Sequence, residues 1–113
     1  MAETVVLKVL GQLRPANTTA ASLYSPGANE EVTINNLVAA NLGTSSVKIR
    51  LFLDDNGTTY DETTAIGWDI EIPPGRIYKH PGVISMNDAT GNLAVRTDTA
   101  NDVNFTATGS VIS

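Results

Sequence analysis

The chain has 113 residues, enough for one compact domain, and its seven basic and twelve acidic side chains give a net charge of -5. A surface that is acidic overall repels phosphate, so nucleic acid is not expected as a partner. The absence of cysteine excludes disulfides, a thiolate nucleophile and cysteine-ligated metals. The first ten residues have no basic start and no sustained apolar run, so we expect neither a signal peptide nor a membrane-spanning segment.

Side chains branched at Cβ are abundant, with ten Val, eight Ile and fourteen Thr. Such side chains are stiff at χ1 and fit a pleated sheet better than a helix. Nine Gly and five Pro supply turns without reaching the level typical of a disordered chain. The composition therefore predicts an all-β protein.

The N-terminal part of the chain predicts two strands. Residues 5–10 are apolar at both parities, which predicts a strand covered on both faces, and Gly11 interrupts it. Residues 21–24 form a short second strand. The segment 25–29 ends that strand because it contains proline and glycine, which favour turns.

The following strand needs a bulge to keep its apolar side chains on one face. Val32 and Ile34 share one parity, whereas Leu37 and Ala39 have the other. One extra residue at positions 35–36 would turn all four side chains inward. We therefore predict a bulge at this point.

Residues 47–53 show the clearest alternation in the sequence. One parity is apolar and predicts a core face. The other parity holds Lys48, Arg50 and Phe52, which predicts a cationic face around an exposed aromatic side chain. The turn-forming and polar residues 54–62 then predict an exposed loop.

The C-terminal half predicts further strands separated by turns. Residues 68–72 alternate, and the Pro-Pro-Gly segment 73–75 separates them from residues 76–79, so we expect these two strands to form a hairpin-like pair. Three more apolar segments follow, at residues 83–84, 93–96 and 103–111. The last of these has an almost ideal alternation.

About eight short strands without a helical segment predict an antiparallel β-sandwich, of immunoglobulin-like or jelly-roll type. We expect residues 1–10 to be an N-terminal strand or contact arm and residues 11–113 to be a single β-sandwich domain. The side chains expected in the core between the sheets are Trp68, Phe105, Leu51, Ile49 and Ile70.

The sequence offers little catalytic equipment, so we expect that the protein is not an enzyme. Its one histidine, His80, lies in a predicted turn with no Ser or Asp nearby in sequence, and the expected role is that of a surface-loop residue. No nucleophile elbow, phosphate loop or zinc motif is present. We expect no catalytic residues and no cofactor.

An acidic segment could offer oxygen ligands to Ca²⁺. Its members are Asp54, Asp55, Asn56, Asp61 and Glu62. The spacing does not fit an EF-hand, because aligning Gly57 with the invariant glycine places Phe52 at the first ligand position. A solvated turn is therefore expected here, without a bound metal.

Several short segments, at turns and strand ends, follow one another in order along most of the chain. They are Leu10-Gly11-Gln12, Pro15-Ala16, Thr18-Thr19, Leu23-Tyr24, Pro26-Gly27, Val38-Ala39-Ala40-Asn41 and Phe105-Thr106-Ala107-Thr108-Gly109-Ser110. In these segments the chain resembles a group of small tailed-bacteriophage virion proteins. The resemblance implies a β-sandwich structural protein that is located in the virion and is assembled in the host cytoplasm.

The leading functional hypothesis is a capsid decoration or cement protein that binds the outer head shell and stabilises it. Its expected partners are the major capsid protein or other virion proteins, and further copies of the chain, with a homotrimer favoured. An alternative hypothesis is a tail- or fibre-associated module that binds a receptor or carbohydrate through Phe52, Tyr60 and Tyr78. A hydrolase that depends on His80 ranks last.

The expected partner contacts fall in two groups. The first ten residues would pair with the sheet edge of a neighbour, and exposed basic side chains would face an acidic partner. The contact residues expected are Val5, Val6, Leu7, Lys8, Lys48, Arg50, Phe52 and Arg76.

Overall fold

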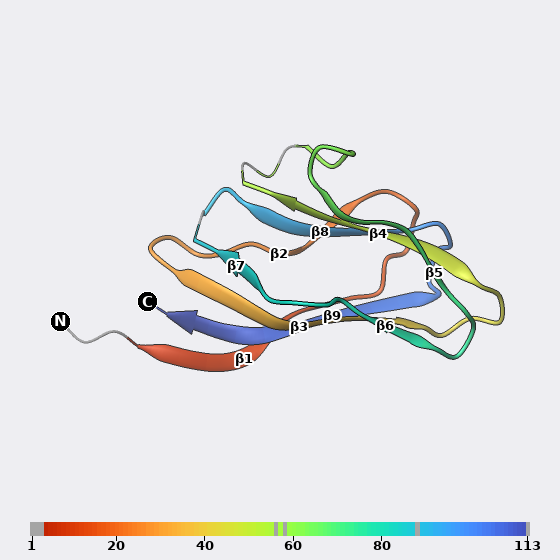
Figure 1. Ribbon diagram of the computed structural model, residues 1–113, viewed down its shortest axis with the longest axis horizontal. Helices are drawn as coiled ribbons and strands as arrows, with labels where there is room; N and C mark the ends of the chain where they lie inside the picture. Colours follow the sequence, from red (N-terminus) through yellow and green to blue (C-terminus); the bar gives the residue numbers. More distant parts are fainter. Residues whose placement is uncertain (1–3, 56, 58, 88, 113) are drawn as a thin grey trace.

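The computed structural model describes residues 4–55, 57, 59–87 and 89–112, and this part of the chain forms nine strands in two antiparallel sheets (Figure 1). The strands are β1 (Val5–Leu13), β2 (Ala21–Tyr24), β3 (Glu31–Asn41), β4 (Val47–Asp54), β5 (Ala65–Ile72), β6 (Ile77–Lys79), β7 (Ile84–Met86), β8 (Asn92–Thr97) and β9 (Val103–Ile112). No helix occurs in the described ranges, which confirms the expected all-β class. Accordingly, those ranges contain no helix able to cross a membrane.

The strand order identifies the sandwich as a jelly roll. Sheet A has the order β1-β9-β3-β6, with β7 also paired to β3, and sheet B has the order β2-β8-β4-β5. Strands β6 and β7 pair with opposite ends of β3, so together they fill one edge position. Most consecutive strands alternate between the two sheets, which is the double Greek key of a jelly roll and not the arrangement of an immunoglobulin domain.

The core lies between the two sheets and is built by alternation along each strand. In β9, Val103, Phe105, Ala107 and Val111 point inward and are buried, as the sequence predicts. Leu51 and Ile49 are likewise buried, and Ile70 packs against the core while partly exposed. The predicted bulge in β3 is confirmed, because the register with β9 shifts between Ile34 and Asn36.

The expectation that Trp68 lies in the core is wrong, since its side chain is 40% exposed on the outer face of sheet B. The register between β4 and β5 shifts between the pairs Ile49–Ile70 and Leu51–Gly67, so β5 holds one extra residue there. Asp69 has a φ of 51° at this bulge. The bulge reverses the parity of the strand, which moves Trp68 away from the core.

The exposure expected for Phe52 is also wrong. It does lie on the outer face of sheet B, but it is only 1% exposed. Its ring packs against Tyr60, at a centroid distance of 6.0 Å, and against Trp68, at 6.3 Å with the rings nearly perpendicular. The segment after β4 therefore folds back over the sheet and builds a small second apolar cluster there.

Two other strand predictions need correction. Residues 68–72 and 76–79 do not form a hairpin-like pair, because β5 belongs to sheet B and β6 to sheet A. The segment 73–75 carries the chain from one sheet to the other. Strand β1 also continues past Gly11 to Leu13, through a register shift at Gly11, where a side chain would meet the carbonyl oxygen of Leu23.

Candidate functional site

The outer surface of sheet A is almost free of charge along β1, β9 and β3. Its members are the residues that alternate with the buried ones in these strands. We call this surface the sheet A outer face; it consists of Val5, Leu7, Val9, Gln12, Glu31, Thr33, Asn36, Val38, Ala40, Asn104, Thr106, Thr108, Ser110 and Ile112. Glu31, at one end of β3, is the one charged residue among them.

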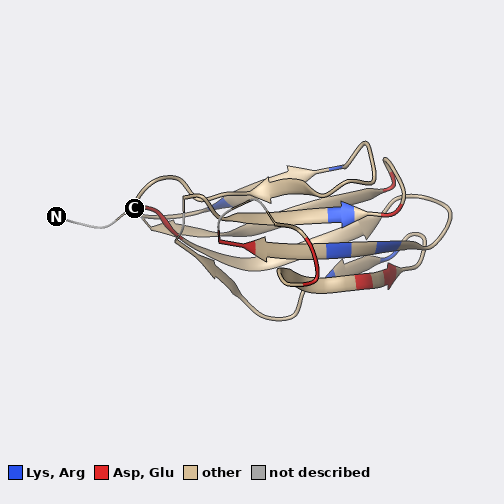
Figure 2. Ribbon diagram, turned by 90° about the horizontal axis from the view of Figure 1, so that it is seen from above, with Lys and Arg blue, Asp and Glu red and all other residues tan. Residues whose placement is uncertain are grey.

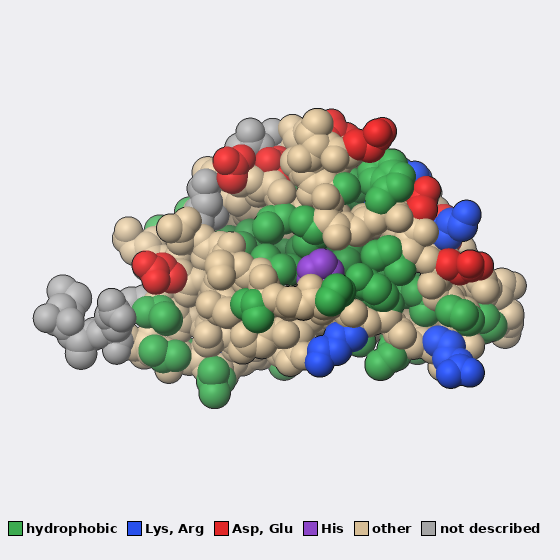
Figure 3. All heavy atoms as spheres, viewed as in Figure 1, with side chains coloured by type: hydrophobic (Ala, Val, Ile, Leu, Met, Phe, Trp, Pro, Cys, Tyr) green, Lys and Arg blue, Asp and Glu red, His purple; other side chains and the backbone are tan. Residues whose placement is uncertain are grey.

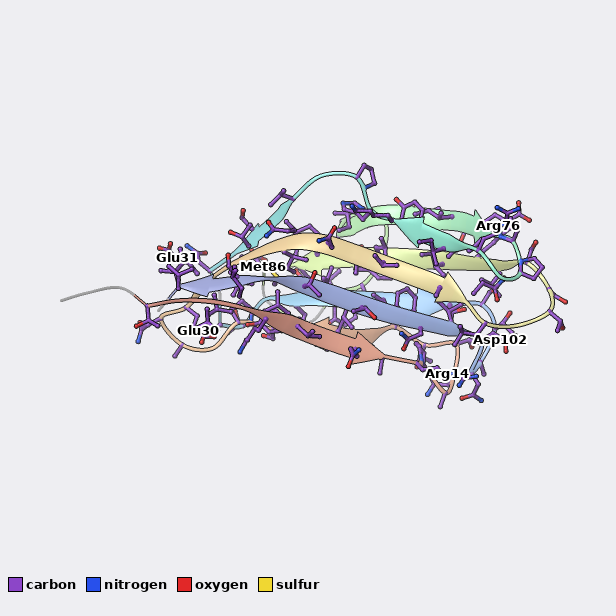
Figure 4. All side chains as sticks on the ribbon, turned by 90° about the horizontal axis from the view of Figure 1, so that it is seen from below. Arg14, Glu30, Glu31, Arg76, Met86 and Asp102 are labelled. Carbon is purple, nitrogen blue, oxygen red and sulfur yellow. The ribbon has the colours of Figure 1, made fainter. Side chains whose placement is uncertain are left out.

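Figure 4 looks onto this face, and the charged residues that it labels lie at the two ends of the sheet. Glu30 and Glu31 lie at one end, and Arg14, Arg76 and Asp102 lie at the other. Along β1, β9 and β3 the centre of the face carries Thr, Ser, Asn, Val and Ala side chains, and the exposed Lys79 of β6 lies beside Val38 at the far border of the sheet. Such a surface can be taken out of water without the cost of burying an unpaired charge.

Strand β1 forms one edge of this face and exposes large apolar side chains. Val5 is 60%, Leu7 78% and Val9 55% exposed. Val6, which points to the other side of the strand, is 44% exposed, so the N-terminal half of β1 is uncovered on both faces. Four exposed aliphatic side chains in five residues form an apolar patch of the kind that marks an interaction site.

Sheet B differs from sheet A because its outer face carries both signs of charge (Figure 2). Lys48 in β4 lies opposite Glu71 in β5. Arg50 donates hydrogen bonds to both carboxylate oxygens of Asp69, at 2.7 and 3.3 Å. Arg96 of β8 lies opposite Arg50 and donates to the carbonyl oxygen of Thr18 at 2.8 Å. Such a mixture of charges is typical of a solvated face.

The ion pair on sheet B is held in place by the aromatic cluster beneath it. The guanidinium carbon of Arg50 lies 3.7 Å from the centroid of the Trp68 ring, a cation–π contact. The hydrogen bond from Arg50 lowers the pKa of Asp69, and the same bond raises the pKa of Arg50. Arg50 thus has two intramolecular partners.

The structure divides the predicted partner contacts between two sheets. Val5, Val6, Leu7 and Lys8 lie together on the exposed edge strand of sheet A. Lys48 and Arg50 lie on the outer face of sheet B, Arg76 lies in the turn before β6, and Phe52 is buried. The two predicted groups therefore do not form one surface. The sequence did not point to the remaining residues of the sheet A outer face. Their shared lack of charge is recognised only when the strand pairing shows that they lie on one side of the sheet.

His80 is half-buried, whereas the sequence suggested an ordinary surface position. Its backbone N–H donates to the carbonyl oxygen of Leu37 at 2.9 Å. Its Nδ1 atom is buried and has no hydrogen-bond partner in the described ranges, and Figure 3 shows the side chain in a hollow among apolar groups. A catalytic histidine needs Nδ1 oriented by a hydrogen bond, and this nitrogen lacks one.

The acidic segment after β4 uses its oxygens to organise the backbone. Asp54 is buried and accepts from the backbone N–H of Thr59 at 2.7 Å, while Asp61 accepts from the N–H of Thr63 at 2.8 Å. The bonds from Thr63 lower the pKa of Asp61. No group of three or more His, Asp or Glu within the described ranges is placed to hold a metal ion. Asn56, which the sequence prediction included, lies outside those ranges.

An open cavity of about 530 Å³ lies at one end of the sandwich, beside this segment. Asp54, Thr63 and Thr64 line one side, and Ser85 and Met86 line the other. The carboxylate and hydroxyl groups on the first side already hydrogen-bond within the chain. These three side chains are therefore already engaged within the chain.

The aromatic side chains proposed for carbohydrate binding do not form one platform. Phe52 is buried, and Tyr60 is half-buried and donates its hydroxyl to the carbonyl oxygen of Gly57 at 3.0 Å. Tyr78 lies in β6 of the opposite sheet. The exposed aromatic residue on sheet B is Trp68, which lines a shallow hollow with Glu62 and Ala65.

No family profile and no curated protein matches the sequence. Solved structures with the same fold do match. A chain of the Helicobacter pylori bacteriophage KHP30 capsid superimposes with a TM-score of 0.55 and 11% identity, over 99% of this chain and 94% of that chain. The chain shares its fold with viral capsid proteins.

Chains of infectious bursal disease virus show the same likeness. One from the T13 viral particle gives a TM-score of 0.57 at 12% identity over 97% of this chain, and one from the VP2 subviral particle gives 0.50 at 17% identity. This chain spans 30% and 32% of those two longer chains. The jelly roll is therefore present both in a phage capsid chain of similar length and as part of a larger viral chain.

Proposed function

We propose that the protein is a structural component of a virion, namely a capsid decoration or cement protein that lies on the outer head shell of a tailed bacteriophage and stabilises it. The observation that carries the proposal is the sheet A outer face, which along β1, β9 and β3 has Glu31 as its one charged residue, together with its apolar edge strand. The cores of protein interfaces are depleted in charged residues, and this face has that composition. Sheet B, with its mixture of charges, would face the solvent.

The structural neighbours support this role. The match to the KHP30 capsid chain extends over nearly all of both chains, which supports a small subunit of a phage capsid. The match agrees with the resemblance of the sequence to small phage virion proteins.

The partner proposed for the sheet A outer face is the major capsid protein. Binding would bury Thr, Ser and Asn side chains that can hydrogen-bond to the shell, with Val5 and Leu7 as apolar contacts at the edge. Lys48, which the sequence predicts as a contact, lies on sheet B and is not part of the contact surface proposed here, whereas Arg76 remains a prediction from the sequence. The homotrimer expected from the resemblance also remains a prediction, and it competes with the dimer proposed in the next subsection.

A matched pair of charge variants tests which sheet meets the shell. Thr108→Glu adds a charge to the middle of the sheet A outer face, opposite Val9 and Asn36. It should weaken binding to heads that lack the protein by roughly tenfold or more, because the charge would be buried without a partner. Lys48→Glu reverses a charge on sheet B and should leave binding intact.

The readout is co-sedimentation of each variant with purified heads across a concentration series, after circular dichroism has shown that each variant folds. Loss of binding by Lys48→Glu with binding retained by Thr108→Glu would move the contact to sheet B. Failure of the unchanged protein to bind heads would remove the decoration role.

A second function, carbohydrate or receptor binding at the surface of the particle, is favoured by one observation. Trp68 exposes 40% of its surface beside a hollow that Glu62 also lines, and an exposed ring with a neighbouring carboxylate is a common sugar-binding arrangement. Trp68→Ala should then abolish binding to host cells or to a glycan array. Unchanged binding, or no binding by the unchanged protein, would exclude this function.

A further inference from the structure

Strand β1 has one edge that no other strand covers within the described ranges. It pairs with β9 on one side only, at the end of sheet A. Figure 1 shows it along the lower border of the sandwich, with its N-terminal half beside the C-terminal end of β9. An uncovered strand edge presents unpaired N–H and C=O groups that favour pairing with another strand.

The residues of this edge are arranged symmetrically about Leu7. Val5, Leu7 and Val9 lie on the outer side of the strand, and Val6 and Lys8 lie on the inner side. When the strand is read from either end, the outer side gives Val, Leu, Val. Such a palindrome is complementary to itself in an antiparallel pair, where residues directly opposite one another share a face.

We propose that two copies of the chain pair through their β1 strands, antiparallel and about a twofold axis that passes beside Leu7. In this register Leu7 lies opposite Leu7 of the second copy, and each Val5 lies opposite a Val9. Sheet A then continues from one copy into the other. The axis is perpendicular to the sheet, so both outer faces lie on the same side.

The charge of Lys8 selects this register over its neighbours. A pair centred on Lys8 would place two ammonium groups directly opposite each other, which is unfavourable. A pair centred on Val6 would leave Val9 without an apolar partner. Centred on Leu7, each Lys8 lies opposite a Val6, and its methylene stem can cover that side chain while its ammonium group stays in water.

The exposure of the strand agrees with a second copy as the occupant. Leu7, at the centre of the proposed pair, has the largest exposure of the apolar side chains recorded, at 78%. Val6 is 44% exposed on the inner side, where sheet B does not cover it. Pairing would cover both. The dimer would also present two uncharged faces side by side, which goes beyond the decoration role proposed above and does not depend on it.

Cysteine cross-linking tests the position of the axis. The chain has no cysteine, so any disulfide of a single-cysteine variant joins two chains. Directly opposed strand residues have Cα atoms about 4.5 to 5.5 Å apart, which suits a disulfide. Leu7→Cys should therefore form a covalent dimer under mild oxidation. Ile77→Cys, at the opposite edge of sheet A and 67% exposed, is the matched control and should stay monomeric under the same conditions.

Paired charge variants test the register without oxidation. Val5→Lys combined with Val9→Glu places opposite charges across the axis and should retain a mass of twice 11.9 kDa in sedimentation equilibrium. Val5→Glu combined with Val9→Glu places like charges there and should give monomers. Both positions are exposed, so we expect each variant to fold, which circular dichroism checks.

The proposal would be overturned if Leu7→Cys and Ile77→Cys formed covalent dimers to the same extent. It would also be overturned if both charge variants had the same mass in sedimentation equilibrium, or if the unchanged protein were monomeric or trimeric at every concentration. Heads are absent from these measurements, so a negative result leaves the decoration role intact. A chain that is monomeric alone but loses head binding on Val5→Glu with Val9→Glu would assign β1 to the shell protein.

Discussion

Replacing Phe52 with alanine tests the unexpected apolar cluster on the outer face of sheet B. The side chain is 1% exposed and lies between the rings of Tyr60 and Trp68. Cutting a buried Phe to Ala costs about 3 to 5 kcal/mol of unfolding free energy. Because a loop covers this site and can collapse into the space, we expect a value near the lower end, about 3 kcal/mol.

Urea denaturation provides the assay, with two probes followed together. Trp68 is the only tryptophan, so its fluorescence reports on this cluster, while far-ultraviolet circular dichroism reports on both sheets. Phe105→Ala, in the core between the sheets, should cost about 3 to 5 kcal/mol. Lys48→Ala, exposed on the same strand as Phe52, should stay within about 0.5 kcal/mol of the unchanged protein.

A loss of less than about 0.5 kcal/mol for Phe52→Ala would refute the reasoning, because that is the range of exposed positions. It would mean that the loop does not cover the ring and that Phe52 is the exposed contact which the sequence predicted. A fluorescence transition that precedes the dichroism transition in the variant would show that the cluster opens separately.

Three further predictions follow from single contacts. Asp69→Asn should remove the stabilising effect of the hydrogen bond between Arg50 and the Asp69 carboxylate. In the unchanged protein this effect is present at neutral pH and is lost as the pH falls through the lowered pKa of Asp69. A stability difference between the two proteins that does not shrink below the ordinary carboxyl pKa of about 3.9 would contradict this. Asn41→Ala should lower the free energy of unfolding in urea by about 2 to 3 kcal/mol. The reason is that the buried amide of Asn41 donates to the carbonyl oxygens of Ser45 and Ile72 at 2.8 and 2.9 Å. An unchanged free energy would show that water replaces the amide. Gly109→Ala should lower the free energy of unfolding by about 1 to 3 kcal/mol, and with it the thermal midpoint, because the added Cβ would meet the backbone of Thr33 and Ile34. An unchanged midpoint would show that the two strands can separate locally.

Alternation along the strands made the class of the fold predictable. In β9 the period of two holds over the whole strand, and in β3 the change of parity correctly indicated a bulge. The choice between a jelly roll and an immunoglobulin-like sandwich was open, because strand order depends on pairings between distant segments that no local pattern records. The hairpin expected across residues 73–75 failed for that reason.

The outer surface of sheet B was less predictable because one bulge and one loop decide it. The bulge at Asp69 reverses the parity of β5 and takes Trp68 out of the core, and nothing in the local alternation marks it. Phe52 has the parity of an exposed residue, but the loop that contains Tyr60, eight residues further along the chain, packs against it. The apolar character of residues 5–10 was visible, and its meaning became clear only when β1 proved to be an edge strand.

The absence of charge on the sheet A outer face could not be noticed from the sequence, because its members come from three separate strands. Leu7, Thr33 and Thr108 are far apart in sequence and lie on one surface only after β9 pairs with both β1 and β3. The prediction of a cationic contact surface relied on one strand alone. In the structure, Arg50 has its counter-charge in the neighbouring strand, at Asp69.

The most direct test of the central claim is co-sedimentation of the purified protein with phage heads that lack it, together with the Thr108→Glu and Lys48→Glu variants. The account predicts saturable binding by the unchanged protein and by Lys48→Glu, and loss of binding by Thr108→Glu. Heads that bind none of the three proteins, while all three are folded, would contradict a role as a capsid decoration protein.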